Sequence, residues 1–357
     1  MSNNNLSQKG KEKQSIQIQQ RRTPSLDILR IILCIGVVFH HFTPERPASG
    51  PFMVLGFFVM SGFLTGIHFH SRNELNANQF YQHKIKRLFP LFLAALITGI
   101  FLNIIQCFYL HPGETGILPH MSTNQWVHLN IAQLVGYYNA PLWFMIIEFY
   151  LLICVPLLFW FYHKKWALPG LLLISMLTSF FLYQQVPYCS DHGCGLYYSP
   201  IARSWQFIAG LVAAKALLTL SPGNAVRRQF ANFACIIMTL IFLTAGVWSM
   251  IVKQAEDLHF WNYTFDFDFT VVGMFCVLVP LLYSRSWNTN DKLSRILSYL
   301  ALLTYPIYLF HVPVFIVCSG IQKRLLPDYA ELSVLTAVII SIIVSDIALR
   351  LQRKYIG

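Results

Sequence analysis

The first strongly apolar stretch of the chain contains ionisable side chains whose spacing points to chemistry. Arg30 and His41 lie eleven residues apart within residues 24–43. At 100° per residue, eleven steps bring the second side chain to within about 20° of the first, so both lie on one helix face. They are about 16 Å apart along the axis. His40 points about 80° away from Arg30, and Asp27 lies one turn before Arg30, within pairing distance.

Charged groups inside apolar helices are costly, by about 2.5–3.5 kcal/mol each on insertion scales, and membrane proteins that retain them generally use them. A cation near one membrane surface and an imidazole toward the other suit anion binding and proton transfer. The alternative is structural: Arg30 extends to the headgroups and His41 lies at the interface. The shared face favours a functional pair.

These side chains must be positioned by membrane-spanning helices. The chain has 357 residues, of which 55% are hydrophobic and 11% charged, whereas ordinary soluble domains carry about 25% charged residues. The mean hydropathy is +0.52, which excludes a soluble globular protein. Because lipid tolerates no open strand edge, apolar stretches of about 20 residues must be helices. We expect an all-α polytopic membrane protein, a bundle of about ten transmembrane helices.

The expected helices form one domain, residues 24–357, after a polar tail at 1–23 that we expect to be disordered. The polar, basic stretch 69–88 is expected to lie along the inner interface as an amphipathic helix. Segment 111–140 is either a re-entrant lid or a plain interfacial loop. The ten apolar segments are 24–43, 51–70, 89–110, 141–162, 166–185, 200–219, 230–252, 264–284, 296–318 and 332–350.

Lysines and arginines orient these helices. With the N-terminus inside, three of the 26 lie within apolar segments, four fall in outer loops and the other 19 lie on the inner side. This distribution places both termini in the cytoplasm. The net charge of +11 therefore reflects topology, and we expect no nucleic-acid partner.

The eight cysteines are scattered and include no CxxC pair, so we expect no metal site and no redox motif. Cys189 and Cys194 are an exception in one respect, because they share an outer loop in an oxidising compartment. Gly193 between them permits a tight turn. We expect these two cysteines to form a disulfide.

Five motifs in order resemble the membrane-bound acyltransferase-3 family, part of a wider group of transmembrane acyltransferases. The family signature is an Arg, ten residues and a His in the first membrane helix, which Arg30 and His41 match. Ile28 stands where the family usually has Gly, and lysines occupy places often held by Arg in the basic element. The other four matches are Gly56–Phe63 with Phe-Phe-x-x-Ser-Gly-Phe, Lys84–Pro90 with Arg-x-x-Pro, Pro141–Tyr150 with a Trp-x-x-x-x-Glu segment, and Tyr305–His311 with Tyr-x-x-Tyr-Leu-x-His.

The resemblance implies an integral membrane O-acyltransferase of the bacterial inner membrane. Such an enzyme transfers an acyl group, usually acetyl, from cytoplasmic acyl-CoA to a hydroxyl of a cell-envelope or secreted polysaccharide. The acceptor is a glycan or a lipid-linked sugar. Acetyl-CoA is the donor substrate, and no permanently bound cofactor is implied.

The resemblance also implies roles for the basic and imidazole side chains. The donor phosphates suit Lys84, Lys86 and Arg87, with Arg30 also holding the donor. His41 acts either as general base on the sugar hydroxyl or as a nucleophile that attacks the thioester. The sequence leaves both mechanisms open.

Three other polar residues have both a functional and a structural interpretation. Glu148 orients an imidazole or pairs with a buried arginine, and otherwise it is an interfacial carboxylate. Arg203 holds an anionic glycan or pairs with Glu148. Ser61 bonds a ligand or, with Gly62, permits close approach of a second helix.

The late motif supplies the last candidates. Tyr305, Tyr308 and His311 are expected to bind the acceptor or support the site. Tyr308 and His311 are three residues apart and share a helix face. His311 is equally consistent with a satisfied histidine in the core.

Two other functions fit the same composition. A non-enzymatic transporter or channel for a glycan, lipid or acyl donor would use buried Arg, His and Glu as a gate or relay. A polysaccharide polymerase would use sugar-lipid substrates and no CoA. Transfer of radiolabel from acetyl-CoA to glycan would separate the enzyme from the transporter. Protection of the protein by CoA against thermal unfolding would exclude the polymerase.

Overall fold

Every regular element that the structure describes is a helix, as the apolar segments predict. The computed structural model describes residues 23–42, 49–72, 74–106, 108, 131–185, 198–220, 265–284, 290–325 and 330–355. The expected segment 230–252, the expected disulfide between Cys189 and Cys194, and residues 1–22 of the tail lie outside these ranges.

Six described helices are long and apolar enough to cross a membrane, and seven if α7 and α8, which are bent by 57° at their junction, form one span. The chain is therefore an all-α, multi-pass membrane protein. Shorter apolar helices occupy Ala167–Leu182 and Asp268–Ser284. The elements are α2 (Pro24–Phe42), α3 (Ser49–His70), α4 (Ala77–Ile105), α6 (Ile131–Tyr138), α7 (Leu142–Ile153), α8 (Val155–His163), α9 (Ala167–Gln185), α10 (Pro200–Leu220), α12 (Phe265–Ser284), α13 (Asp291–Leu325) and α14 (Ala330–Tyr355).

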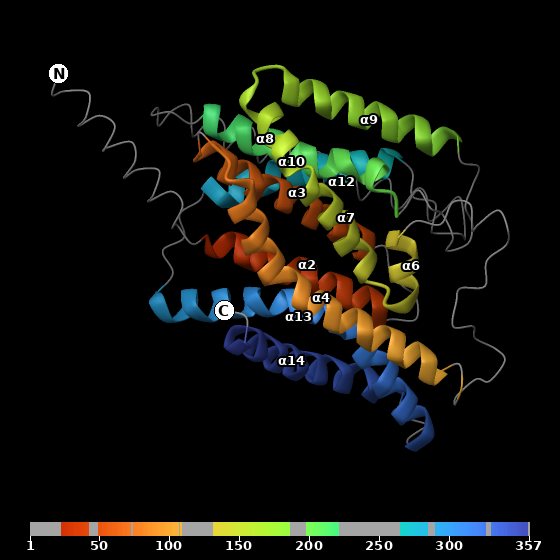
Figure 1. Ribbon diagram of the computed structural model, residues 1–357. Coiled ribbons are helices and arrows are strands. Elements are labelled where there is room, and N and C mark those ends of the chain that lie inside the picture. The colour runs from red at the N-terminus through yellow and green to blue at the C-terminus, as the bar shows by residue number, and fades with distance from the viewer. Residues whose placement is uncertain are drawn as a thin grey trace.

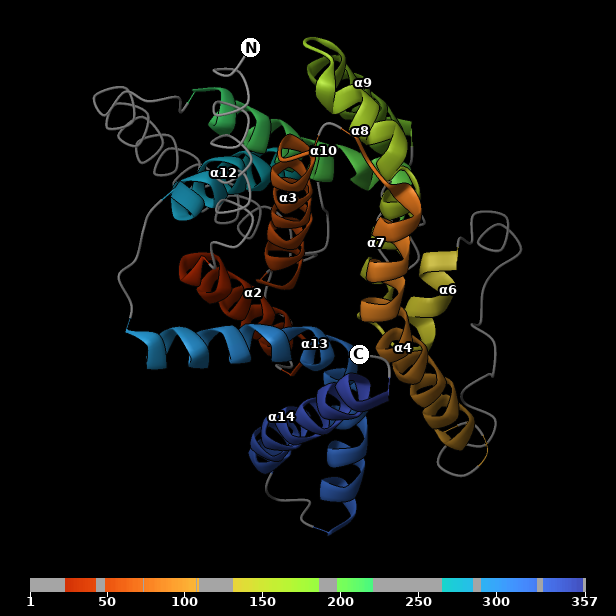
Figure 2. The same ribbon diagram turned by 60° about the vertical axis from the view of Figure 1, so that its left-hand side comes forward.

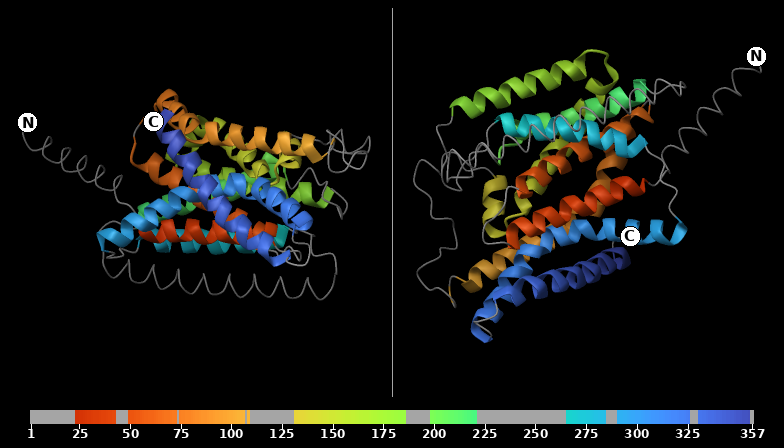
Figure 3. Two further views of the ribbon diagram at one scale, coloured as in Figure 1. Left: turned by 90° about the horizontal axis from the view of Figure 1, so that it is seen from below. Right: turned by 180° about the vertical axis from the view of Figure 1, so that it is seen from behind.

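The helices pack in a sequence of neighbours across the bundle. From one side to the other, α14 packs on α13, α13 on α2, α2 on α3, α3 on α10 and α10 on α9 (Figure 1). The turned view separates α12 on one side of α3 from α4, α6 and α7 on the other (Figure 2). Seen from behind, the axes of α9, α12, α2, α13 and α14 are roughly aligned (Figure 3). The centre of the bundle is thus formed by α2, α3 and α13.

Most described lysines and arginines gather at one end of the bundle, which we call the basic end. Here α2, α4, α9 and α13 begin and α3, α8, α10, α12 and α14 end. Side-chain hydrogen bonds join these ends, such as Ser25 Oγ to the Leu282 carbonyl at 2.6 Å and Lys215 Nζ to the Lys164 carbonyl at 2.7 Å. The remaining helix ends form the opposite end of the bundle.

The stretch 69–88 does not form a separate interfacial helix. Residues Ala77–Ile105 are one continuous helix, α4, which carries the basic residues directly into the bundle. Pro90 lies inside α4 and has no N–H, so the carbonyl of Lys86 loses its helical partner. Gln352 Nε2 of α14 donates to that carbonyl at 3.2 Å. This replacement bond helps the helix to continue through the proline.

α3 and α10 approach until their backbones touch. A Cβ added at Gly62 would lie 2.0 Å from the Phe207 carbonyl oxygen, and one added at Gly210 would lie 2.2 Å from the Val59 carbonyl oxygen. Only glycine fits at either position. The close approach expected at Gly62 is therefore confirmed, as in other membrane helix pairs with small residues at the contact.

Candidate active site

A cavity of about 620 Å³ lies between α2, α3, α4, α7 and α13 at the basic end. Ligand sites commonly span about 300–1,000 Å³, so a sizeable organic molecule fits. Its charged lining comprises four cations and, among the described residues, one carboxylate. These are Arg30, Arg72, Lys84, Arg87 and Glu148. The excess of positive charge favours an anionic ligand.

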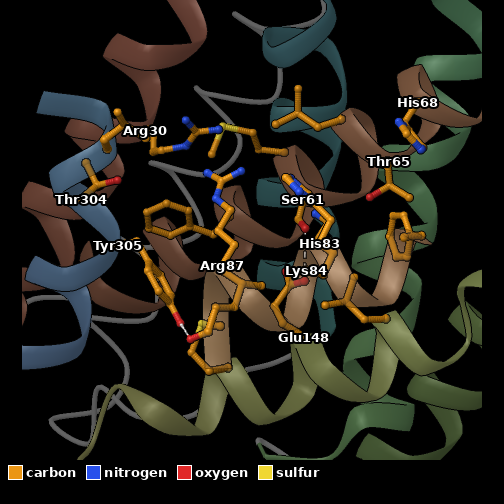
Figure 4. Close-up of a pocket in the computed structure, with 18 of the residues that line it drawn as sticks. Arg30, Ser61, Thr65, His68, His83, Lys84, Arg87, Glu148, Thr304 and Tyr305 are labelled. Carbon is orange, nitrogen blue, oxygen red and sulfur yellow. Dashed lines mark hydrogen bonds between the residues drawn. The ribbon is translucent and has the colours of Figure 1, made fainter. Parts of the chain in front are cut away.

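Arg30 is held in place by the acid one turn before it. Its Nη1 lies 3.4 Å from Asp27 Oδ1, which confirms the expected ion pair. Asp27 Oδ2 accepts a hydrogen bond from Ser298 Oγ of α13 at 3.3 Å. Figure 4 shows the guanidinium groups of Arg30 and Arg87 extending into the same region. The two cations enter it from different helices, α2 and α4.

Glu148 is buried in the wall of the cavity, with 7% of its surface exposed. Ser61 Oγ donates to its Oε2 at 3.1 Å, and Lys84 lines the same cavity (Figure 4). Its Oε1 has no hydrogen-bond partner among the described residues. Within the described residues Glu148 is therefore bonded to Ser61 and to neither of its expected partners, since no imidazole bonds to it and Arg203 pairs with Asp268. Its second oxygen can accept a hydrogen bond from a ligand.

Three aromatic rings line the part of the cavity nearest the opposite end of the bundle. Phe57, Phe144 and Tyr308, which we call the ring triad, have centroid separations of 6.1, 6.0 and 5.7 Å. Tyr308 Oη donates to the Pro141 carbonyl at 3.0 Å, which fixes its ring. The cavity is thus charged toward the basic end and aromatic at its far end.

A pair of histidines lies beyond the ring triad. His311 follows Tyr308 by three residues, a rise of about 4.5 Å, and its Nε2 lies 3.2 Å from His41 Nδ1. The ring centroids are 5.0 Å apart. His311 is fully buried and His41 is half-buried, and neither is among the cavity-lining residues. α2 and α13 bring the two imidazoles together.

The turn between α6 and α7 is anchored next to this pair. Asn139 is 1% exposed, and its Nδ2 donates to the Leu309 carbonyl at 2.9 Å. That carbonyl lacks its helical partner because Pro313, four residues later, has no N–H. The end of segment 111–140 therefore packs on α13, and residues 109–130 lie outside the described ranges.

The cavity brings together seven of the residues selected from the sequence and leaves others outside it. Lys86 and Arg87 are both exposed, but Arg87 lines the cavity and Lys86 does not. Arg203 is buried and pairs with Asp268 at 2.5 Å, which joins α10 to α12. The seven are Arg30, Ser61, Lys84, Arg87, Glu148, Tyr305 and Tyr308.

Three basic or imidazole residues of the lining were not selected from the sequence: His68, Arg72 and His83. A signal for them was present, since His83 belongs to the basic stretch and Arg72 lies at its start. Their place in the lining depends on how α3 and α4 meet at the basic end.

Comparison with known proteins places the chain in a family. A family model described as "Acyltransferase domain" matches residues 23–349. The chain is similar to "O-acetyltransferase OatA" of Staphylococcus aureus (strain NCTC 8325 / PS 47), with 22% identity over 313 residues, covering 83% of this chain and 51% of that protein. It is similar to "Peptidoglycan O-acetyltransferase OatA" of Listeria monocytogenes, with 23% identity over 342 residues, covering 88% and 53%.

The chain spans about half the length of the curated relatives that it matches. No solved structure matches it. The family match nevertheless extends over most of the chain and includes α2, α3, α4, α7 and α13, which form the cavity. The chain therefore belongs to the acyltransferase-3 family.

Proposed function

We propose that the protein is an O-acyltransferase that moves an acyl group, most simply acetyl, from acyl-CoA to a hydroxyl of a cell-envelope or secreted glycan. The observation that carries this proposal is the juxtaposition of a basic cavity with a pair of bonded histidines, His41 and His311, one helical turn beyond its aromatic end. The printed names of two relatives, an O-acetyltransferase and a peptidoglycan O-acetyltransferase, support the reaction class and the kind of acceptor.

The charge of the cavity supports acyl-CoA as the donor. Coenzyme A has phosphates at its nucleotide end and an uncharged pantetheine arm that carries the thioester. Arg72, Lys84 and Arg87 match the phosphates near the basic end, and arginine can bind such oxygens in a bidentate manner. Glu148 Oε1 matches an amide N–H of the arm. The thioester is then directed toward the ring triad and the histidines.

The basic end faces the cytoplasm in this proposal, because lysine and arginine accumulate on the cytoplasmic side of membrane helices. The donor therefore enters from the compartment in which acyl-CoA is made. The acceptor glycan approaches from the opposite end of the bundle, and the membrane is the bacterial inner membrane.

His41 performs the chemistry by one of two routes. As general base, its Nε2 takes the proton of the glycan hydroxyl, whose oxygen bonds to the thioester carbon; the C–S bond breaks and the leaving thiolate takes the proton back. As nucleophile, Nε2 bonds to the thioester carbon as the C–S bond breaks and the thiolate leaves. The oxygen of the glycan hydroxyl then bonds to the acyl carbon, the C–N bond breaks to release neutral imidazole, and the hydroxyl proton passes to the thiolate. Both routes produce a glycan ester and free CoA.

The test is transfer of label from radiolabelled acetyl-CoA to glycan in membranes containing the protein. His41→Ala should lower the rate by about 10²–10⁴-fold, the usual contribution of a general base, while the protein still inserts and expresses. His40→Ala is the matched control, since it removes the neighbouring ring, which packs against Gly50 and lies 5.1 Å from the His41 ring, and retains His41 itself. Loss of transfer in His40→Ala with retention in His41→Ala would refute the assignment. Absence of transfer in membranes with the wild-type protein would refute the proposed acyltransferase activity.

A further inference from the structure

We infer that His311 is a positioning residue for His41: its Nε2 accepts a hydrogen bond from His41 Nδ1–H and so holds His41 in the tautomer whose Nε2 has an unprotonated lone pair. This inference rests on the proposed function for its catalytic meaning. The tautomer of His41 is inferred only from the geometry of α2 and α13.

The hydrogen of His311 is placed by its own helix. His311 Nδ1 lies 2.9 Å from the Tyr308 carbonyl oxygen and 3.1 Å from the Ile307 carbonyl oxygen. Carbonyl oxygens only accept hydrogen bonds, so Nδ1 must carry the hydrogen. In a neutral imidazole the other nitrogen is then an acceptor. His311 is 0% exposed, and a neutral ring suits that setting because burying an unpaired charge is costly.

The hydrogen of His41 follows from the same reasoning. His41 Nδ1 lies 3.0 Å from the Val37 carbonyl oxygen and 3.2 Å from His311 Nε2. Both neighbours are acceptors, so Nδ1 carries a hydrogen that the two share. The lone pair of the neutral His41 ring is consequently at Nε2. This is the nitrogen that both proposed routes require.

The packing around His311 keeps its ring in place. Phe42 lies against it with a centroid distance of 5.8 Å and stacks on Phe315 at 4.7 Å. Farther along the same pair of helices, Cys34 Sγ lies 3.5 Å from the Thr304 carbonyl oxygen. These contacts fix the relative position of α2 and α13. A rigid acceptor costs no reorganisation during the reaction.

The consequence for the reaction is electrostatic. When Nε2 of His41 takes a proton or bonds to the acyl carbon, the ring becomes cationic and Nδ1–H becomes a stronger donor. The lone pair of His311 stabilises that charge without taking the proton. A buried carboxylate fills the corresponding place in serine hydrolase triads, whereas the described structure offers a neutral imidazole here.

The test compares two replacements of His311. His311→Gln retains an acceptor, because the amide oxygen reaches roughly the place of Nε2, whereas His311→Leu removes it. We expect His311→Leu to lower kcat for acetyl transfer by about 10²–10⁴-fold with little change in KM for acetyl-CoA, and His311→Gln to restore a large part of kcat. Phe315→Leu is the control, since it disturbs the packing of the same helix turn without removing an acceptor.

A second measurement reads the tautomer without any need for activity. The ¹⁵N chemical shifts of histidine side chains distinguish a protonated from an unprotonated ring nitrogen. The signal of His41, one of 12 histidines, is identified by its absence in His41→Gln. We expect an Nδ1–H, unprotonated Nε2 pattern in the wild type. In His311→Leu, Nδ1–H keeps the Val37 carbonyl but loses His311 Nε2, so we expect a larger share of the other tautomer.

The outcomes are distinguishable. An unchanged His41 pattern in His311→Leu, or equal loss of kcat in His311→Leu, His311→Gln and Phe315→Leu, overturns the inference and assigns His311 a structural role. If the tautomer of His41 changes in His311→Leu but the wild-type protein transfers no acetyl group, the positioning geometry is supported and the proposed function is overturned.

Discussion

Arg87 and Lys86 are neighbours in the chain, but the helix turns only Arg87 toward the cavity. The two residues therefore separate the effect of a local positive charge from that of a contact with ligand. Consecutive helical residues point about 100° apart, so the distinction follows from geometry alone. At the residue scale, membership of the site depends on where a side chain points as well as on its charge.

Arg87→Ala should weaken CoA binding by about 10-fold or more, because loss of a hydrogen bond to a charged partner costs about 1.5–3 kcal/mol. Lys86→Ala should change it little. The measurement is the rise in Tm of the purified protein with increasing CoA. An equal loss in both variants would mean that the charge of the basic end, and not a contact from Arg87, binds the donor.

Arg30→Lys keeps the positive charge but loses the planar fork of the guanidinium. Arg30 meets Asp27 through Nη1, but the proposed contact with the donor uses the fork, so we expect Arg30→Lys to recover only part of the donor affinity that Arg30→Ala loses. Steady-state kinetics should show a raised KM for acetyl-CoA in both. Full recovery in Arg30→Lys would contradict the expected bidentate contact.

At the scale of helices, the distance between α3 and α10 is set by contact between their backbones and not between their side chains. Gly62→Ala should lower the Tm of the detergent-solubilised protein, because its methyl group would overlap the Phe207 carbonyl; overpacking typically costs about 1–3 kcal/mol. Gly320→Ala in α13 is the control, since an added Cβ there meets nothing within 4 Å. A normal Tm for Gly62→Ala would show that the two helices can separate at little cost.

Features that depend on one continuous segment could be predicted from the sequence, and contacts between two distant segments could not. The apolar segments, the face shared by Arg30 and His41, and the close approach at Gly62 each follow from local spacing. The contact of His41 with His311 joins residues 270 positions apart. Its partners are fixed by how α2 and α13 pack, which no local period encodes.

Helix boundaries were misjudged where a distant residue compensates for a local one. The polar, basic stretch 69–88 indicated a separate interfacial helix, yet α4 continues through Pro90, where Gln352 donates to the carbonyl that lacks its helical partner. The break at Cys154 lies within an uninterrupted apolar run, so hydropathy could not reveal it. The interior of a helix is thus easier to infer than its ends.

At the scale of the whole molecule, orientation in the membrane follows from the placement of lysine and arginine. A reporter fused after Gly357 should be cytoplasmic, and one fused at Gly113 should be external, because 19 of the 26 basic residues lie on the inner side in this topology. Protease or thiol-reagent accessibility of the reporters measures this. A cytoplasmic reporter at Gly113 would show that the number of spans before it is wrong.

The ring triad has an electrical consequence for the proposed reaction. Moving one elementary charge across a membrane potential of 100 mV involves about 2.3 kcal/mol. The cations that match the donor phosphates lie on the basic side of Phe57, Phe144 and Tyr308, so the charged carrier stays on the side from which it came. In the proposed reaction the acyl group passes the rings in one direction and the proton of the glycan hydroxyl returns to the thiolate in the other, so no net charge crosses. Acyl transfer by this proposed route therefore does no work against the voltage and draws none from it.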